Sequence, residues 1–283
     1  MHKNFWKGKI KMLNTEKRNE ASMHIDKMDT LSMVTLMNKE NMNAVMAVEK
    51  ALPDIAHVCD KVAECFEKGG RLFYIGAGTS GRLGIIDAAE CPPTFGVPSA
   101  QVVGIIAGGE KCVVHAGEGN EDSAEDGKKD IAAQGICEKD ILIGISAAGG
   151  AAYVMGALEY ANSVGAYTVS ISNNHNTPIE KTAKSSIVAD TGAEVITGST
   201  RLKAGTAQKI ILNMISTSAM VKTGKVYENM MINLKPSNVK LRDRVIRIVR
   251  EIKKCEYDEA VALLDQNGWD IRKAVENNAD GNK

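Results

Sequence analysis

Aromatic side chains are scarce in this chain of 283 residues, where Phe, Trp and Tyr together make up 4%. Few rings are therefore available to stack on nucleic-acid bases. Net charge is absent too, because 35 acidic residues balance 35 basic ones, so no overall field attracts nucleic acid or an anionic membrane. Hydrophobic residues make up 44%, yet no apolar run approaches the roughly 20 residues of a membrane-spanning helix. We expect a globular protein with neither a nucleic-acid nor a membrane partner.

Paired cysteines and clustered histidines are missing as well. The six cysteines contain no C-x-x-C pair, which favours free thiols in a reducing compartment. The five histidines lack the spacing of metal ligands, so we predict no metal site. The first twelve residues are basic but lack the apolar core of a signal peptide, and we therefore expect a cytoplasmic protein.

Strand and helix patterns alternate through the middle of the chain. Short apolar runs such as 141–145 are typical of strands buried on both faces, as in a parallel sheet. The alternation predicts an α/β fold with a doubly wound parallel sheet and a ligand at the carboxyl ends of its strands. We expect strands at 71–76, 101–107, 140–146, 166–172 and 185–190, and helices at 80–89, 121–134, 151–163 and 176–183.

The flanking segments contain helical patterns only. Apolar residues recur at helical spacing from Glu40 to Lys68, where Pro53 predicts a break between two helices. Beyond residue 200 we expect no further strands, but helices at 204–223 and 237–254 and two short amphipathic segments within 257–278. The chain then divides into an N-terminal arm (1–39), the α/β domain (40–235) and a small C-terminal helical region (236–283).

The most informative stretch follows the first predicted strand. A loop of small and hydroxyl residues, Gly76 to Arg82, leads from that strand directly into a helix. Backbone N–H groups and the positive end of a helix dipole make such a turn a site for an anion. Glycine lets the backbone approach the ligand closely, and side chains add hydroxyl donors. We therefore predict that a phosphorylated small molecule is bound by Gly78, Thr79, Ser80, Gly81 and Arg82.

The spacing Gly76-x-Gly78-x-x-Gly81 also fits the fingerprint of a dinucleotide-binding turn. That fingerprint expects an acidic residue at the end of the second strand, whereas the 101–107 run ends in two glycines. A nicotinamide-dependent oxidoreductase explains only this spacing. A tight strand-to-helix turn without any ligand is a third alternative.

Two acidic segments are placed to act on a ligand in this loop. Glu90 follows the loop by about one helix length, which would return its carboxylate toward the ligand. Glu121 stands in an acidic cluster, 118–122, before the helix expected from about Ser123. Two carboxylates at one edge of a sheet form an acid–base pair when their environments separate their pKa values. The alternatives are a surface glutamate at a helix end for Glu90 and helix caps for the cluster.

Hydroxyl and cationic side chains gather in a third segment, 192–209. Ser199 or Thr200 is a candidate cap for the apolar helix that follows. Arg201 and Lys203 are candidates to bind an anionic ligand. A capped helix with a solvated basic turn is the alternative.

These three segments together resemble the N-acetylmuramic acid 6-phosphate etherases, which have the sugar-isomerase (SIS) fold of phosphosugar-binding domains. The most specific segments are GAGTSGRLGIIDAAECPPTFG (76–96) and GAEVITGSTRLKAGTAQK (192–209), the second of which the related glucokinase regulatory proteins share. The resemblance begins at Leu13, in the segment LNTEKRN, and runs through Asp243. The helices that follow resemble the UBA-like tail of the same family.

The resemblance implies a lyase of peptidoglycan recycling that cleaves the D-lactyl ether of N-acetylmuramic acid 6-phosphate to N-acetylglucosamine 6-phosphate and D-lactate. The family reaction is an elimination followed by hydration on the open-chain sugar, and it needs no metal or redox cofactor. The catalytic acidic residues of the family correspond to Glu90, which protonates lactate, and Glu121, while the identity of the base stays open. The family is typically homodimeric. Further contacts with the substrate are expected from Glu194, Ser199, Thr200, Arg201 and Lys203.

One loop departs from the family pattern. After the third strand, relatives carry a sequence close to Ala-Ala-Ser-Gly-Arg-Thr-Pro-Tyr. The serine, arginine, threonine and proline of that pattern fall here on Ala148, Gly150, Ala151 and Ala152. Each hydrogen bond lost to a phosphate costs about 1.5–3 kcal/mol, and Ser146 is a candidate to replace one hydroxyl. The departure supports an alternative function, a non-catalytic phosphosugar sensor.

Overall fold

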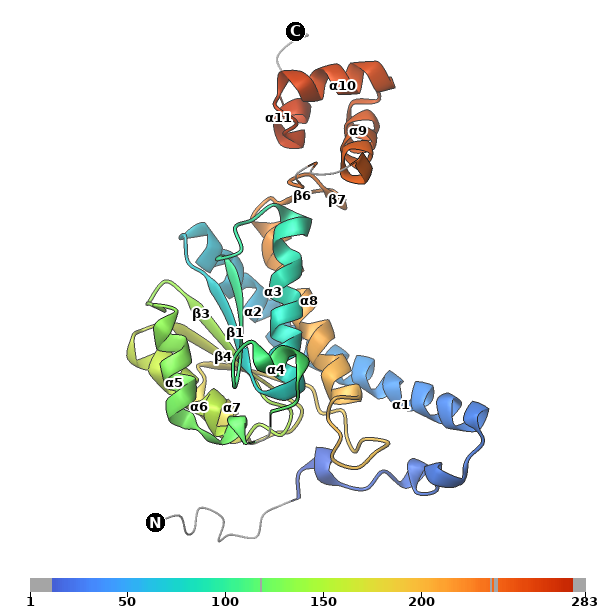
Figure 1. Ribbon diagram of the computed structural model, residues 1–283, viewed down its shortest axis with the longest axis vertical. Helices are drawn as coiled ribbons and strands as arrows, with labels where there is room; N and C mark the ends of the chain where they lie inside the picture. Colours follow the sequence, from blue (N-terminus) through green and yellow to red (C-terminus); the bar gives the residue numbers. More distant parts are fainter. Residues whose placement is uncertain (1–11, 118, 235, 237–238, 277–283) are drawn as a thin grey trace.

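Five parallel strands form the centre of the protein, in the order β2-β1-β3-β4-β5. The structure is a computed structural model that describes residues 12–117, 119–234, 236 and 239–276. Each strand lies within one of the predicted ranges, so the predicted α/β fold with its doubly wound parallel sheet is confirmed (Figure 1). The strands are β1 (Leu72–Gly76), β2 (Val102–Ile106), β3 (Ile141–Ile145), β4 (Tyr167–Ser172) and β5 (Ser185–Val188).

Helices cover both faces of the sheet (Figure 1). Alternate residues of β1 enter different cores, so that Tyr74 packs on the face of α2 and α8 and Ile75 packs on the face of α6. All five residues of β1 are buried, as a strand covered on both faces requires. One face carries α2 (Leu52–Glu67), α3 (Gly78–Phe95) and α8 (Lys203–Lys222), and the other carries α5 (Ala124–Ala133), α6 (Ala152–Ser163) and α7 (Pro178–Thr182). The connection after β2 contains α4 (Lys111–Val114) and the 3₁₀ turn η4 (Asn120–Asp122).

The N-terminal segment starts with three 3₁₀ turns and continues into a long helix that projects from the sheet (Figure 1). These elements are η1 (Asn14–Glu16), η2 (Glu20–Ser22), η3 (Ile25–Lys27) and α1 (Thr30–Lys50). The Asp29 carboxylate caps α1 by accepting the backbone N–H of Ser32. α1 runs without interruption across the boundary expected at residue 39. α2 begins with Pro53 in its first turn, where the sequence predicts a break between helices.

Helix α3 continues through two prolines. The sequence predicts this helix at 80–89, but it extends to Phe95 with Pro92 and Pro93 inside it. Neither proline has an N–H to donate to the carbonyl one turn earlier, and this loss favours ending the helix. Burial of Phe95 in the core under the sheet offsets the loss. Glu90 therefore lies inside a helix rather than at its end.

The C-terminal part forms its own cluster of helices (Figure 1). These helices share a small core around Val245, Val249 and Leu264. A pair of two-residue antiparallel strands, β6 (Val226–Tyr227) and β7 (Met230–Met231), precedes them, so the expectation of no strand beyond residue 200 is wrong. The helices are α9 (Val239–Lys253), α10 (Tyr257–Gln266) and α11 (Ile271–Glu276). Residues 237–238 and 277–278 of the predicted helical ranges lie outside the described residues.

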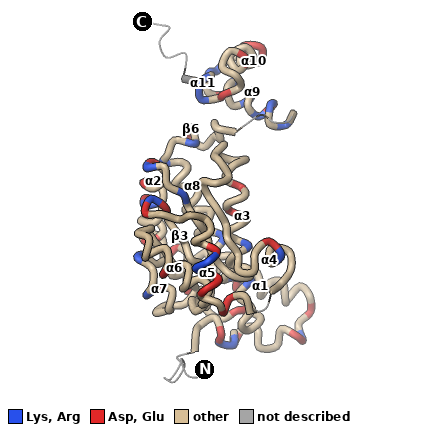
Figure 2. The backbone as a smooth tube through the Cα atoms, turned by 60° about the vertical axis from the view of Figure 1, so that its left-hand side comes forward, with Lys and Arg blue, Asp and Glu red and all other residues tan. Residues whose placement is uncertain are grey.

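Basic and acidic side chains are mixed over both parts of the molecule, in keeping with the balanced composition (Figure 2). All six cysteines are free thiols, as the sequence predicts. Within the described part of the chain, no helix combines the length and the apolar character that crossing a membrane requires.

Candidate active site

The carboxyl ends of β1 and β3 are neighbours at the centre of the sheet. The chain leaves β1 into α3 on one face and leaves β3 into α6 on the other face. The two connections diverge, and open α/β sheets bind ligands in the crevice at such a switch point. The loop after β1 and the altered loop after β3 therefore lie together at the edge where a ligand is expected.

A cavity of about 290 Å³ opens at this edge. It is lined by the two loops, by residues in front of α8, and by one residue each from η1 and η4. Among the predicted site residues, those that line it are Gly78, Thr79, Ser80, Glu121, Ser146 and Thr200. The other lining residues are Glu16, Ala77, Ile145, Ala147, Ala148, Ala151 and Gly198.

Close packing explains the glycines around the start of α3. A Cβ on Gly81 would lie 2.6 Å from the carbonyl oxygen of Gly76, so a larger residue forces the helix away from β1. A Cβ on Gly205 in α8 would lie 3.3 Å from the Thr79 methyl carbon, so the first turns of α3 and α8 meet at Thr79. The N-terminus of α3, whose first N–H groups face the cavity at Gly78 and Thr79, thus favours an anion there.

The hydroxyl of Ser80 is already engaged inside the protein. Ser80 Oγ donates to Gln208 Oε1 at 2.9 Å, and Gln208 Nε2 donates to Asn173 Oδ1 at 3.0 Å. All three side chains are buried. A phosphate dianion only accepts hydrogen bonds, so in this arrangement Ser80 offers it a backbone N–H and not its hydroxyl proton. The relay ties the loop after β1 to α8 and to the end of β4.

Ser146 is the hydroxyl residue of the loop after β3. Its Oγ accepts the backbone N–H of Gly149 at 3.1 Å, and its own hydroxyl proton remains available to a ligand. Gly149 has a φ of 74°, and a Cβ there would lie 2.3 Å from the Cβ of Thr177, so only glycine fits. Ala148 and Ala151 present methyl groups to the cavity. This loop offers a ligand one hydroxyl and backbone N–H groups.

Arg82 binds the protein backbone and does not line the cavity. Its Nε donates to the carbonyl of Val113 at 2.8 Å, and its Nη2 donates to the carbonyl of His115 at 3.0 Å. These bonds hold the connection between β2 and η4 against α3. Ser199 and Arg201, two other predicted contacts, also lie outside the cavity lining, and Arg201 is exposed.

Lys203 and Glu194 form part of the scaffold behind the cavity. Glu194 is buried and accepts the backbone N–H groups of Lys203 and Ala204 at 3.2 and 2.9 Å, so it caps α8. Burial raises the pKa of the Glu194 carboxyl. Lys203 Nζ lies 2.6 Å from Glu40 Oε2 on α1. Burial raises the pKa of Glu40, but its hydrogen bonds with Lys203 and Asn19 outweigh burial and lower that pKa.

The two predicted catalytic glutamates occupy different places. Glu121 of η4 lines the cavity. Glu90 is exposed and lies twelve residues beyond Gly78 on α3, which corresponds to about 18 Å along the helix. That separation exceeds the length of one sugar phosphate, so α3 carries Glu90 away from the cavity of its own chain and does not return it. Glu118, in the same acidic cluster as Glu121, lies outside the described residues.

Sequence comparison identifies the family. A protein from Clostridium beijerinckii named N-acetylmuramic acid 6-phosphate etherase is 50% identical over 266 residues, which cover 94% of this chain and 88% of that protein. A protein of the same name from Aeromonas hydrophila is 51% identical over 261 residues, covering 92% of this chain and 88% of the relative. The chain belongs to the N-acetylmuramic acid 6-phosphate etherase family. The resemblance seen in the sequence is thereby confirmed.

Two further comparisons, one with a domain model and one with a solved structure, concern the SIS domain and the fold. Residues 54–162 match the model of the glucokinase regulatory protein N-terminal SIS domain. A phosphoheptose isomerase from Neisseria gonorrhoeae has the same fold, with a TM-score of 0.51 at 15% identity, covering 68% of this chain and 98% of the isomerase. At that identity the similarity concerns the fold alone.

A second carboxylate in the cavity of this etherase-family chain, beside Glu121, was missed by reasoning from the sequence. Glu16 of η1 lines the cavity together with Glu121 and Thr79. Its segment, LNTEKRN, carries part of the family resemblance, but no helical or strand period marks it as part of a site. Only the fold, which brings η1 to the ends of β4 and β5, shows where Glu16 lies.

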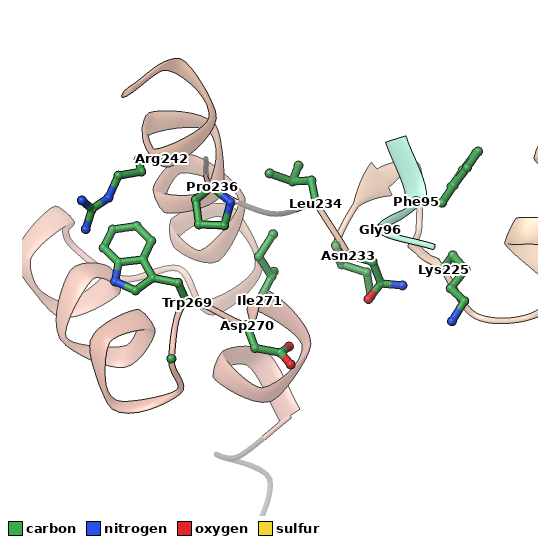
Figure 3. Close-up of a pocket in the computed structure, with 12 residues that line it drawn as sticks. Phe95, Gly96, Lys225, Asn233, Leu234, Pro236, Arg242, Trp269, Asp270 and Ile271 are labelled. Atoms are coloured by element: carbon green, nitrogen blue, oxygen red, sulfur yellow. The ribbon is translucent and has the colours of Figure 1, made fainter. Parts of the chain in front are cut away.

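A larger cavity, of about 680 Å³, lies between the sheet domain of this etherase-family member and its C-terminal helices (Figure 3). On one side Arg242 stacks over the ring of Trp269, with 4.1 Å between the guanidinium carbon and the ring centroid. On the other side lie Phe95, Gly96 and Lys225 (Figure 3). This cavity is lined by neither predicted phosphate loop and by no predicted catalytic residue. The predicted site residues that line a cavity therefore line the smaller one and not this one.

Proposed function

We propose that this protein cleaves the D-lactyl ether of N-acetylmuramic acid 6-phosphate and produces N-acetylglucosamine 6-phosphate and D-lactate. The observation that carries the proposal is the position of Glu121, which lines the same cavity as the N-terminus of α3. Relatives at about 50% identity carry the name of this activity. The cavity thus combines a place for phosphate with a carboxylate that can move a proton.

The phosphate is held mainly by backbone groups. The N–H groups at the start of α3, the hydroxyl of Thr79 and the free hydroxyl proton of Ser146 surround the proposed phosphate position. The methyl groups of Ala148 and Ala151 contribute no hydrogen bond. Binding therefore relies on the N-terminus of α3 rather than on a cation, since Arg82 and Lys203 are engaged elsewhere.

The reaction requires one group that takes a proton and one that gives a proton. In the open-chain sugar, the aldehyde at C1 makes the C2 proton acidic, and Glu121 removes it. A double bond forms between C2 and C3, the C3–O bond breaks, and Glu90 protonates the departing lactate oxygen. A hydroxyl group from water then adds to C3, and a proton returns to C2. The net reaction consumes one water molecule and requires no metal or redox cofactor.

Glu90 reaches the reaction from a second copy of the chain. In its own chain Glu90 lies about 18 Å along α3 from the cavity, on an exposed face that also carries Ile86, 54% exposed. In a homodimer with two-fold symmetry, the same contact would bring each Glu90 to the cavity of the partner. The proposed active site is therefore shared between two chains.

Helix α1 supplies a surface for such a dimer. Leu31, Val34, Met42 and Val45 recur at helical spacing on one face and are between 49% and 73% exposed. α1 projects from the sheet, so this face lies open in the single chain (Figure 1). An exposed apolar face of this kind marks an interface. A second copy of the chain is the occupant that also explains the position of Glu90.

We place this activity in the cytoplasm, in the recycling of peptidoglycan sugars. Six free thiols suit a reducing compartment, and the substrate is a phosphorylated sugar. The experiment that tests the function is turnover of N-acetylmuramic acid 6-phosphate in water enriched in ¹⁸O. Elimination and hydration place the heavy oxygen at C3 of N-acetylglucosamine 6-phosphate and leave D-lactate unlabelled. Label in lactate would show cleavage on the other side of the ether oxygen, and absence of lactate would remove the proposed activity.

A further inference from the structure

Glu16 points a charged group into the proposed active site without a partner of its own. It lines the cavity with Thr79 and Glu121, and its Oε2 lies 3.3 Å from the position that a Cβ on Gly198 would take. Among the residues that the structure describes, no side chain or backbone donor is paired with its carboxylate. An unpaired carboxylate at the wall of a cavity is available to a hydrogen-bond donor on a ligand.

The position of Glu16 is fixed by its neighbours. Thr15 is fully buried, and its backbone N–H donates to Asn174 Oδ1 at 3.4 Å. The Nδ2 of Asn174 donates both to Thr15 Oγ1 and to the carbonyl of Ala147, each at 3.0 Å. Asn14 Nδ2 donates to Asp190 Oδ2 at 2.6 Å. The side chain of Asn174 thus joins Thr15, the residue before Glu16, directly to the loop after β3. These bonds fix the position of Glu16 relative to the proposed phosphate position.

The charge of Glu16 decides which part of a ligand it can meet. A phosphate dianion next to this carboxylate would be repelled, because both are negative and share a cavity of about 290 Å³. The sugar part carries donors instead, in its hydroxyl groups and in the N–H of the acetamido group. A carboxylate that accepts a hydrogen bond from such a donor binds more strongly than a neutral acceptor does.

We propose that Glu16 is a substrate-contacting residue that accepts a hydrogen bond from a hydroxyl or amide N–H of the sugar and so favours a sugar phosphate over phosphate alone. The identity of the sugar rests on the proposed function, but the contact itself does not require turnover. Glu16 orients the sugar ring relative to the phosphate, while Glu121 moves protons. Its removal therefore weakens binding of the sugar moiety and leaves the phosphate position intact.

The test compares binding of N-acetylglucosamine 6-phosphate and of inorganic phosphate to the full chain and to two variants. Glu16→Ala should weaken binding of the sugar phosphate by roughly ten- to a hundredfold, the size of one hydrogen bond to a charged group. Binding of inorganic phosphate should stay unchanged or become tighter, because a negative charge is removed. Glu16→Gln, which keeps an acceptor oxygen, should lose less. Glu20→Ala, in the same exposed segment but outside the cavity lining, is the matched control and should bind both ligands as the unmodified chain does.

Two results would overturn the contact. One is sugar-phosphate binding in Glu16→Ala equal to that of the unmodified chain. The other is an equal loss for both ligands, which would mean that the variant disturbs the loop rather than a contact with the sugar. The proposed function fails separately, when the unmodified chain binds N-acetylglucosamine 6-phosphate but releases no lactate from N-acetylmuramic acid 6-phosphate. In that case the two binding series still decide the role of Glu16.

Discussion

Glu90 and Glu121 do not share a cavity within one chain. Glu121 lines the cavity at the ends of β1 and β3, whereas Glu90 is exposed on α3, about 18 Å along the helix from Gly78. A reaction that needs both carboxyl groups at one sugar therefore needs either two chains or a large movement of α3. The buried residues of α3, which pack against the sheet, oppose such a movement.

Mixing two inactive variants tests the shared site. Glu90→Gln and Glu121→Gln should each lower turnover by about a hundredfold or more, the usual contribution of an acid–base group. In a dimer that contains one chain of each kind, one of the two sites has both glutamates intact. After random reassembly half of the dimers are mixed, so about a quarter of the original activity should return. No recovery in mixtures shown to exchange chains would contradict a site shared in this way.

The N-terminus of α6, which follows the loop after β3, lacks a side-chain cap. Ala151 is the N-cap residue of α6 and has no capping side chain, and Ala152 is the first residue of the helix. Threonine caps helices and proline is favoured at the first position, so Ala151→Thr with Ala152→Pro should stabilise the protein by about 1 kcal/mol. Urea denaturation measures the change. A loss of stability would mean that the loop has a different backbone from the one described.

Restoring all four positions tests phosphate binding. Gly150 is exposed, and a Cβ on it meets no atom within 4 Å, so a longer side chain can start there without a clash at its base. A chain with Ala148→Ser, Gly150→Arg, Ala151→Thr and Ala152→Pro should bind N-acetylglucosamine 6-phosphate at least tenfold more tightly, because it adds a hydroxyl and a cation at the anion. Titration of both chains gives the ratio. Equal affinity would show that the N-terminus of α3 alone already determines phosphate binding.

Close packing of α3 on β1 predicts the effect of a single methyl group. In Gly81→Ala the new Cβ would lie 2.6 Å from the Gly76 carbonyl oxygen and 2.7 Å from a side-chain carbon of Ile106. We expect a loss of about 1–3 kcal/mol in the free energy of unfolding, the usual cost of overpacking. Gly150→Ala is the matched control, since space is open there. An equal effect in the two variants would argue against the close contact.

The ion pair of Glu40 with Lys203 predicts how stability depends on pH. The pKa of Glu40 is lowered in the folded protein, so its contribution is fully present above the unfolded value, about 4.3. As the pH falls through this value, the unfolded state binds a proton first and the contribution is progressively lost. The unmodified chain should therefore lose stability between pH 5 and pH 3 more steeply than Glu40→Gln does. Parallel curves of unfolding free energy against pH would contradict the pairing.

The sequence predicts the sheet and the glycine-rich turn between β1 and α3 well, because both depend on local patterns. Strands buried on both faces appear in the sequence as short apolar runs, and a glycine-rich turn after such a run predicts a tight strand-to-helix connection. The continuation of α3 through Pro92 and Pro93 was not predictable, since burial of Phe95 overrides a local helix-breaking signal. At the end of α3, tertiary packing rather than local sequence therefore determines where the helix stops.

The partners of charged side chains were also beyond the sequence. Lys203 meets Glu40 across 163 positions of the chain, and nothing local distinguishes that pairing from a contact with phosphate. Arg82 finds backbone carbonyls in a connection whose path the sequence does not define. Glu16 enters the cavity because buried Thr15 holds its segment to Asn174, a contact between distant positions. Residue types thus indicated an anion site, while the fold decided which of them line it.

The most direct test of the account is release of D-lactate from N-acetylmuramic acid 6-phosphate by the unmodified chain and by Glu121→Gln, measured together with binding of N-acetylglucosamine 6-phosphate. We predict release by the unmodified chain, release at least a hundredfold slower in the variant, and similar binding by both. The account would be contradicted by an unmodified chain that binds the sugar phosphate without releasing lactate, or by a variant that releases it at the original rate.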